Sequence, residues 1–336
     1  MLICLLLPSA GSYASAAQSI KTLQTPPPAS ARDVSVDPAL AEASSLLQQG
    51  KPTEADPLLR SYLSQHPNSA DAHFLLGHAL FRQIQEGDWS GRESNAPYRE
   101  EKAKASLAEF TAGAKYRTPR ASDLKIVALD YVLLRDFSDA DKWLTRMLEW
   151  TPNDSEGWYY LGRTKYNENR FEEAVRAFQQ SLKLDPNNVK TEDNLGLAYA
   201  GLGRADDAVA AYNTAMEWQK DAPIKNPGPF VNLADLLLDQ NRSEDAIPYL
   251  HQAIHISPQD FKTHELLGKA FVRLDRFPEA QAELEKAVQL APENANLPCM
   301  LGPIYRKQGL NERGKIELDR CASLNGTNSS PEKPRP

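Results

Sequence analysis

The chain has 336 residues, of which 41% are hydrophobic and 25% charged, and its formal net charge is −7. This composition is typical of a soluble folded protein, and no apolar run reaches the roughly 20 residues that a membrane-spanning helix needs. The acidic balance and the lack of clustered Lys and Arg argue against nucleic acid as a partner, because binding to a phosphate backbone relies on clustered cations.

The first 17 residues have features of a signal peptide. A short apolar run at 2–7 is followed by Ala-Ser-Ala at 14–16, the A-x-A form of a signal-peptidase site, although no Lys or Arg precedes the run. We therefore expect residues 1–17 to be removed and the protein to be exported, either to the periplasm or as a secreted protein. Residues 18–35 are rich in Pro, Ala and Ser and lack periodicity, so we expect a flexible leader there.

Small residues recur at fixed intervals along the rest of the chain. One series of alanines has spacings of 34, 34, 38 and 34 residues; another small residue lies twelve positions before each alanine, and a large apolar residue lies four positions after it. Two helices can cross closely where one of them presents a small residue, so the spacing predicts stacked helical hairpins, with Gly162 facing Ala174. The three series are Ala140, Ala174, Ala208, Ala246 and Ala280; Ala128, Gly162, Gly196, Ala234 and Gly268; and Leu144, Phe178, Tyr212, Leu250 and Leu284.

The repeat at 155–188 carries a family resemblance. Its W-Y-Y-L-G at 158–162, followed by Ala174, Phe178 and Pro186, matches the pattern W-x2-L-G…A-x3-F…P. The chain therefore resembles the tetratricopeptide-repeat (TPR) family, which implies an all-α fold, a right-handed α-solenoid of about eight helix-turn-helix hairpins. In this register the expected repeats are 36–69, 70–120, 121–154, 155–188, 189–222, 227–260, 261–294 and 295–328, followed by a disordered tail at 329–336.

Two repeats depart from the regular length. Four extra residues around 221–226 are expected to lengthen a helix by about one turn. A longer insertion at 82–98 contains Gly87, Trp89 and Pro97, which predicts a loop between the two helices of the second repeat. Trp89 on this loop either takes part in recognition or folds back on a neighbouring helix.

The last repeat is expected to be the loosest. It carries Pro303 inside its first helix and Gly314 where Ala is expected, and an interior proline costs about 3 kcal/mol. Cys299 and Cys321 fall on the two helices of this hairpin and are a possible disulfide. Their side chains could instead point apart, because one position faces the groove and the other the core.

The resemblance implies that a peptide or partner protein binds along a concave groove lined by the first helix of each repeat. Asn194 and Asn232 share the sixth position of neighbouring repeats and form either a two-rung ladder for a peptide backbone or a pair of solvated side chains. Lys262, Lys269 and Arg273 favour an acidic segment or are simply solvated. The inward-facing residues implied by the family pattern are Tyr159, Arg163, Asn194, Asn232, Asp235, Lys262, Glu265, Lys269 and Arg273.

Other kinds of site have little support in the sequence. The carboxylate clamp of some family members is not matched, because Asp193 and Leu197 stand where its first Lys and Asn belong, and Leu266 replaces its last Arg. His251 and His255 share one helical face, but no H-E-x-x-H motif or third ligand accompanies them. We therefore predict no catalytic residue, no metal site and no cofactor.

Three classes of function remain open. The leading one is a non-catalytic scaffold or adaptor that binds a peptide or partner protein, with no nucleic acid and no membrane span. The second is a structural or self-assembly factor of the cell envelope. The third is an accessory subunit of an enzyme complex.

Overall fold

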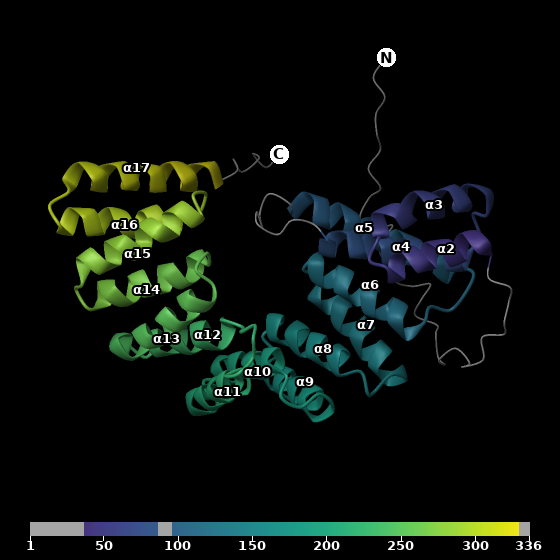
Figure 1. Cartoon of the computed structure of the whole chain (residues 1–336), viewed down its shortest axis with the longest axis horizontal. Coiled ribbons are helices and arrows are strands. Elements are labelled where there is room, and N and C mark those ends of the chain that lie inside the picture. Colours follow the sequence, from purple (N-terminus) through teal and green to yellow (C-terminus); the bar gives the residue numbers. More distant parts are fainter. Residues whose placement is uncertain (1–36, 87–95, 329–336) are drawn as a thin grey trace, which may run out of the picture. The chain divides into compact units, whose positions relative to one another are not determined.

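A computed structural model describes residues 37–86 and 96–328, and over these residues every regular element is a helix (Figure 1). The predicted signal peptide, leader and tail, and Trp89, lie outside the described residues. The helices are α2 (Pro38–Gln48), α3 (Pro52–Gln65), α4 (Ala70–Glu86), α5 (Ala96–Ala114), α6 (Ala121–Leu133), α7 (Phe137–Trp150), α8 (Ser155–Asn167), α9 (Phe171–Leu184), α10 (Val189–Gly201), α11 (Ala205–Trp218), α12 (Gly228–Asp239), α13 (Ser243–Ile256), α14 (Phe261–Arg273), α15 (Phe277–Leu290), α16 (Asn296–Lys307) and α17 (Asn311–Asn328).

Consecutive helices pack as hairpins in two compact units. The first unit ends at Leu184 and contains the hairpins from α2–α3 to α8–α9; the second begins at Asp185 and contains those from α10–α11 to α16–α17. Within each unit the first helices of neighbouring hairpins also touch, as α4 does with α6 and α12 with α14. The fold is therefore the all-α stack of helical hairpins that the repeat spacing predicts.

The buried series of small residues makes room for large ones. A Cβ placed on Gly162 would lie 2.6 Å from the ring of Phe178, and one on Gly196 would lie 2.5 Å from the ring of Tyr212. The three atoms nearest to the Gly162 position all belong to Phe178, so this ring is its first neighbour, and the approach of Gly162 to Ala174 stays a prediction. The missing Cβ admits the aromatic ring between the helices, and Ala174 is itself fully buried.

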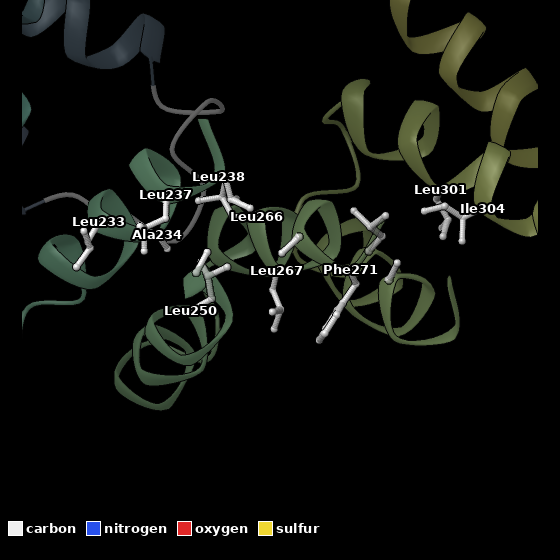
Figure 2. Packing of buried hydrophobic residues seen from close by; sticks show 14 of the residues in the cluster. Leu233, Ala234, Leu237, Leu238, Leu250, Leu266, Leu267, Phe271, Leu301 and Ile304 are labelled. Atoms are coloured by element: carbon white, nitrogen blue, oxygen red, sulfur yellow. The ribbon is translucent and has the colours of Figure 1, made fainter. Parts of the chain in front are cut away.

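The apolar core of the second unit runs from one hairpin into the next (Figure 2). Leu233 and Leu237 of α12 belong to the same buried cluster as Leu266 of α14 and Leu301 of α16. A single hairpin cannot bury both of its faces, so its stability depends on its neighbours. This arrangement leaves the remaining face of the first helices to polar side chains.

The insertion in the second hairpin is shorter than predicted. α4 continues to Glu86 and α5 begins at Ala96, so residues 82–86 and 96–98 are helical and do not belong to a loop. Gln83 is buried, and its amide donates to the carboxylate of Asp56 at 3.0 Å. Burial of this turn against α3 keeps it helical.

The extra residues near 221–226 form a loop and do not lengthen a helix. α11 ends at Trp218 and α12 begins at Gly228. The side chain of Gln219 donates to the carbonyl of Asn226 at 2.9 Å and accepts from the Asn226 amide at 2.6 Å. This pair of hydrogen bonds closes the loop, so the added chain leaves the helical register of both neighbours unchanged.

The last hairpin contains a disulfide. Pro303 lies inside α16, and the sulfur atoms of Cys299 and Cys321 are bonded at 2.03 Å between α16 and α17. The backbones approach closely here, since a Cβ on Gly314 would lie 2.9 Å from the carbonyl oxygen of Gly302. Within the described residues no helix has the length and apolarity that a membrane crossing needs.

Candidate partner-binding face

Seven of the predicted groove residues lie on three first helices of the second unit. Side-chain caps set where two of these helices begin: Asn188 accepts from the amide of Thr191 before α10, and Asp260 accepts from the amide of Thr263 before α14. These starts determine which side chains lie on the unpacked face. We call this surface the first-helix face; its predicted residues are Asn194, Asn232, Asp235, Lys262, Glu265, Lys269 and Arg273.

Asn232 is bonded to a buried carboxylate. Its side-chain amide donates to Oδ1 of Asp193 at 2.8 Å, which links α12 to α10. Asp193 is only 5% exposed, and burial raises the pKa of its carboxyl to about 6, while the bond from Asn232 opposes that shift. Asn232 thus has a structural contact in addition to any contact with a partner.

Asn194 is held by its own helix. Its amide donates to the carbonyl of Lys190 at 2.7 Å. The two asparagines therefore each use one N–H inside the protein, in separate contacts. Among the described residues no donor contacts either side-chain oxygen, so these oxygens are the groups available to the N–H of a partner.

Asp235 lies among charges from the next helix. Burial, together with the charge of Asp239, raises the pKa of its carboxyl, and Lys269 and Lys262 of α14 oppose that shift. Lys262 also forms an ion pair with Glu265 at 3.1 Å. The face therefore presents closely spaced charges of both signs.

Arg273 has a structural contact that sequence reasoning did not foresee. Its guanidinium donates to the carbonyl of Leu238 near the end of α12. Arg82 makes the same contact with Leu47, also 35 residues earlier in the chain. Arginine at this position joins the ends of successive first helices, so Arg273 has a structural contact in addition to any contact with an acidic partner.

Tyr159 and Arg163 lie on α8 in the first unit. The guanidinium of Arg163 is 5.8 Å from the centre of the Tyr159 ring, and that ring also contacts Tyr160 and Phe178. This pair lies on a first helix of the other unit and is not part of the first-helix face, so its role in binding stays a prediction.

The histidine pair of α13 is exposed at both positions, His251 and His255. In the described part of the chain no group of three or more His, Cys, Asp or Glu side chains is arranged to hold a metal ion.

Asp193 is the residue of this face that the sequence did not identify. The sequence marked it only as a mismatch to the carboxylate clamp. Its burial depends on Gly228, where a Cβ would lie 2.5 Å from the carboxylate Oδ2. A glycine at the start of the next repeat's first helix is the one feature of the sequence that indicates this buried carboxylate. That glycine is not part of the repeat pattern.

Family models described as tetratricopeptide repeat match residues 40–90, 155–188, 193–221 and 231–296, which together exceed half of the chain. The chain is 27% identical over 164 residues to "Protein O-mannosyl-transferase TMTC3" of Mus musculus, covering 46% of this chain and 18% of that protein. It is 25% identical over 191 residues to "DnaJ homolog subfamily C member 7 homolog" of Schizosaccharomyces pombe, covering 53% of this chain and 40% of that protein. The chain thus spans less than half the length of these relatives.

A solved structure covers more of the chain. The crystal structure of the APC/C hetero-tetramer Cut9-Hcn1 matches with a TM-score of 0.55 at 15% identity, over 86% of this chain and 53% of that one. At this identity the similarity shows the fold alone.

Proposed function

This chain belongs to the tetratricopeptide-repeat family, and from that premise we propose that it is a non-catalytic scaffold that holds a peptide or partner protein against the first-helix face of α10, α12 and α14. The family's fold supports protein interaction in general. The choice of face is our inference from the side chains that helix packing leaves accessible.

The observation that carries the proposal is the row of polar groups across three successive hairpins. The oxygens of Asn194 and Asn232 can accept from a peptide backbone, and Asp235 lies among the lysines of α14. A segment crossing these helices would meet hydrogen-bond acceptors first and mixed charges next. Each such hydrogen bond contributes about 0.5–1.5 kcal/mol, so we expect a weak grip that tolerates many sequences.

Photocrosslinking tests the proposal. A photoreactive amino acid at position 194 or 269 should capture the same small set of proteins from the native host. The same group at Gln252, exposed on second helix α13, is the control. Equal capture of the same proteins from Gln252 would reject the first-helix face as the site.

Substitutions then measure single contacts. Asn194→Ala and Lys269→Ala should each lower capture by about two- to tenfold without changing the melting temperature. Asn232→Ala is unsuitable for this purpose, because it removes the hydrogen bond to buried Asp193 and so lowers stability as well.

We also propose that the protein is exported, on the basis of the features of residues 1–17. Amino-terminal sequencing of the mature chain from its host would find a start after residue 16 or 17. A mature chain that retains residues 1–17 would contradict export.

A further inference from the structure

A groove of about 740 Å³ opens in the first unit between the second helices α7 and α9, with α8 at its base. The two second helices pack mainly through α8, so their outer sides remain apart. We call this the α7–α9 groove. Its lining residues are Thr145, Leu148 and Glu149 of α7; Trp158, Leu161 and Lys165 of α8; and Glu173, Arg176, Ala177 and Gln180 of α9.

In two other hairpins a glutamate stands at the position that corresponds to Ala177 and contacts a histidine at the position that corresponds to Trp158. In α14–α15, His264 contacts Glu283 at 2.7 Å, and in α4–α5, His73 contacts Glu109 at 2.6 Å. In the register of the repeat, the same two positions of α8–α9 hold Trp158 and Ala177. Ala177 has a smaller side chain than the glutamate at this position of those hairpins, and it lines the open groove.

The base of the groove is apolar. Leu148, Leu161 and Ala177 are buried below it, and Trp158 forms part of its wall. The indole N–H of Trp158 already donates to the carbonyl of Pro152 at 2.8 Å. The tryptophan can therefore offer an incoming group only its ring, which favours an apolar side chain over a carboxylate at this point.

The rim carries one cation without a counter-ion. Lys165 is bonded to Asp141 at 2.7 Å and to Glu173 at 3.2 Å, and Glu149 is paired with Arg146 at 2.5 Å. Arg176 is exposed, and none of the described carboxylates or rings contacts it. The rim is thus complementary to a single negative charge.

We propose that the α7–α9 groove is a second docking surface, for a protein segment that inserts one bulky apolar side chain between α7 and α9 and places a carboxylate beside Arg176. This surface goes beyond the first-helix face, because it is built from second helices and lies in the other unit. Either surface can therefore fail its test without affecting the other.

The expected affinity of a peptide for the α7–α9 groove determines how its binding can be measured. Burying one large apolar side chain contributes about 1.5–3 kcal/mol, and an exposed ion pair adds at most about 1 kcal/mol. A short peptide should therefore bind with a Kd of about 1 mM or weaker, within reach of nuclear magnetic resonance.

The test uses the full chain labelled with fluorinated tryptophan, with the signal of Trp158 identified by its loss in Trp158→Phe. The probe is the blocked peptide acetyl-Phe-Ala-Ala-Glu-amide, which sets its two groups about one helical turn apart. Binding of this peptide should change the chemical shift of the Trp158 fluorine signal. The version with Gln for Glu should bind about two- to fivefold more weakly, and the version with Ala for Phe should leave the signal in place.

Variants locate the contact. Arg176→Ala should weaken binding of the Phe-Glu peptide to the affinity of the Gln version. Ala177→Phe should fill the groove and abolish the change in the Trp158 signal. Lys183→Ala, an exposed cation on the same helix but outside the groove, is the control and should bind like wild type. Circular dichroism checks folding; if Ala177→Phe does not fold, the exposed Arg176→Ala variant decides the result with the peptide pair.

The proposal is overturned if the Phe-Glu peptide leaves the Trp158 signal unmoved at about ten times the expected Kd. It is also overturned if the Glu and Gln peptides bind equally, or if Arg176→Ala binds the Glu peptide as wild type does.

Discussion

Two acidic side chains, Asp193 and Asp130, are buried in this protein with few polar neighbours. Among the residues that the structure describes, neither carboxylate oxygen of Asp130 has a hydrogen-bond partner, and the nearby Ser106 hydroxyl donates to the carbonyl of Gly77 at 3.1 Å. Burial raises the pKa of the Asp130 carboxyl well above its ordinary value, with Ser106 opposing the shift. Both carboxyls therefore hold a proton more tightly in the folded chain than in the unfolded one.

Asp193 gives a pH dependence with a definite sign. Its pKa is about 6 in the folded state against 3.8 ordinarily, so the carboxyl favours unfolding as the pH rises from about 4 to about 6, and its effect levels off above that. The substitution Asp193→Asn removes this titration. The free energy of unfolding of the variant, relative to wild type, should rise by about 2–3 kcal/mol between about pH 4 and about pH 7.

Urea denaturation of both chains at each pH measures this difference. The comparison must be with wild type, because Asp130 contributes a slope of the same sign. A constant difference across the range would show that Asp193 is ionised in the folded protein at low pH and that its burial has no such effect.

At the scale of the helical element, the turn of every hairpin except α4–α5, whose connection lies outside the described residues, contains one residue in left-handed backbone conformation. The φ angles at these residues lie between 55° and 78°. Glycine and asparagine tolerate this conformation, whereas other residues are strained in it. The residues are Gly50, Arg135, Asn169, Gly203, Asn241, Asp275 and Gly309.

Arg135 is the residue least suited to its turn. It has φ of 60° between α6 and α7, so Arg135→Gly should raise the free energy of unfolding by about 0.5–1 kcal/mol. Gly203→Ala at the matching turn of α10–α11 should lower it by about 1–2 kcal/mol. Thermal denaturation of the two variants measures both effects, and a loss of stability in Arg135→Gly would refute the strain argument.

A ring at the fourth position of a repeat ties it to the preceding repeat. The indole of Trp158 donates to the carbonyl of Pro152 at 2.8 Å, and a ring nitrogen of His264 lies 3.2 Å from the carbonyl of Pro258. The proline that ends one second helix thus also supplies an acceptor to the next first helix. This contact explains why His can take the position that the pattern W-x2-L-G gives to Trp.

At the scale of the whole molecule, stability in a stacked array depends on each hairpin's neighbours, and within the described residues the hairpin α16–α17 packs against one other hairpin, through α15. Among residues 311–326 of α17, for which burial is described, Gly314 alone is buried. The disulfide between Cys299 and Cys321 spans 22 residues and holds α17 to α16. It adds a covalent link to the packing between these two helices.

Cys321→Ser should therefore loosen α17 selectively. A disulfide that closes a loop of this size contributes about 3 kcal/mol, so hydrogen exchange in α17 should become much faster while α12–α15 keep their protection. Mass spectrometry of exchanged peptides measures this, with reduced wild type as the matched control. Unchanged exchange in α17 would show that helix packing alone holds the hairpin.

By itself the sequence determined the hairpins, their period and the buried series, because small and large residues at fixed spacing such as Gly162 and Phe178 satisfy a local packing rule within one repeat. Only the tertiary structure decided which polar side chains of the first-helix face already form hydrogen bonds within the protein. Asn232 meets Asp193 across 39 residues and Arg273 meets Leu238 across 35, so both contacts join separate repeats. Such contacts depend on how hairpins stack and on single glycines such as Gly228, and the period of the sequence carries no information about either.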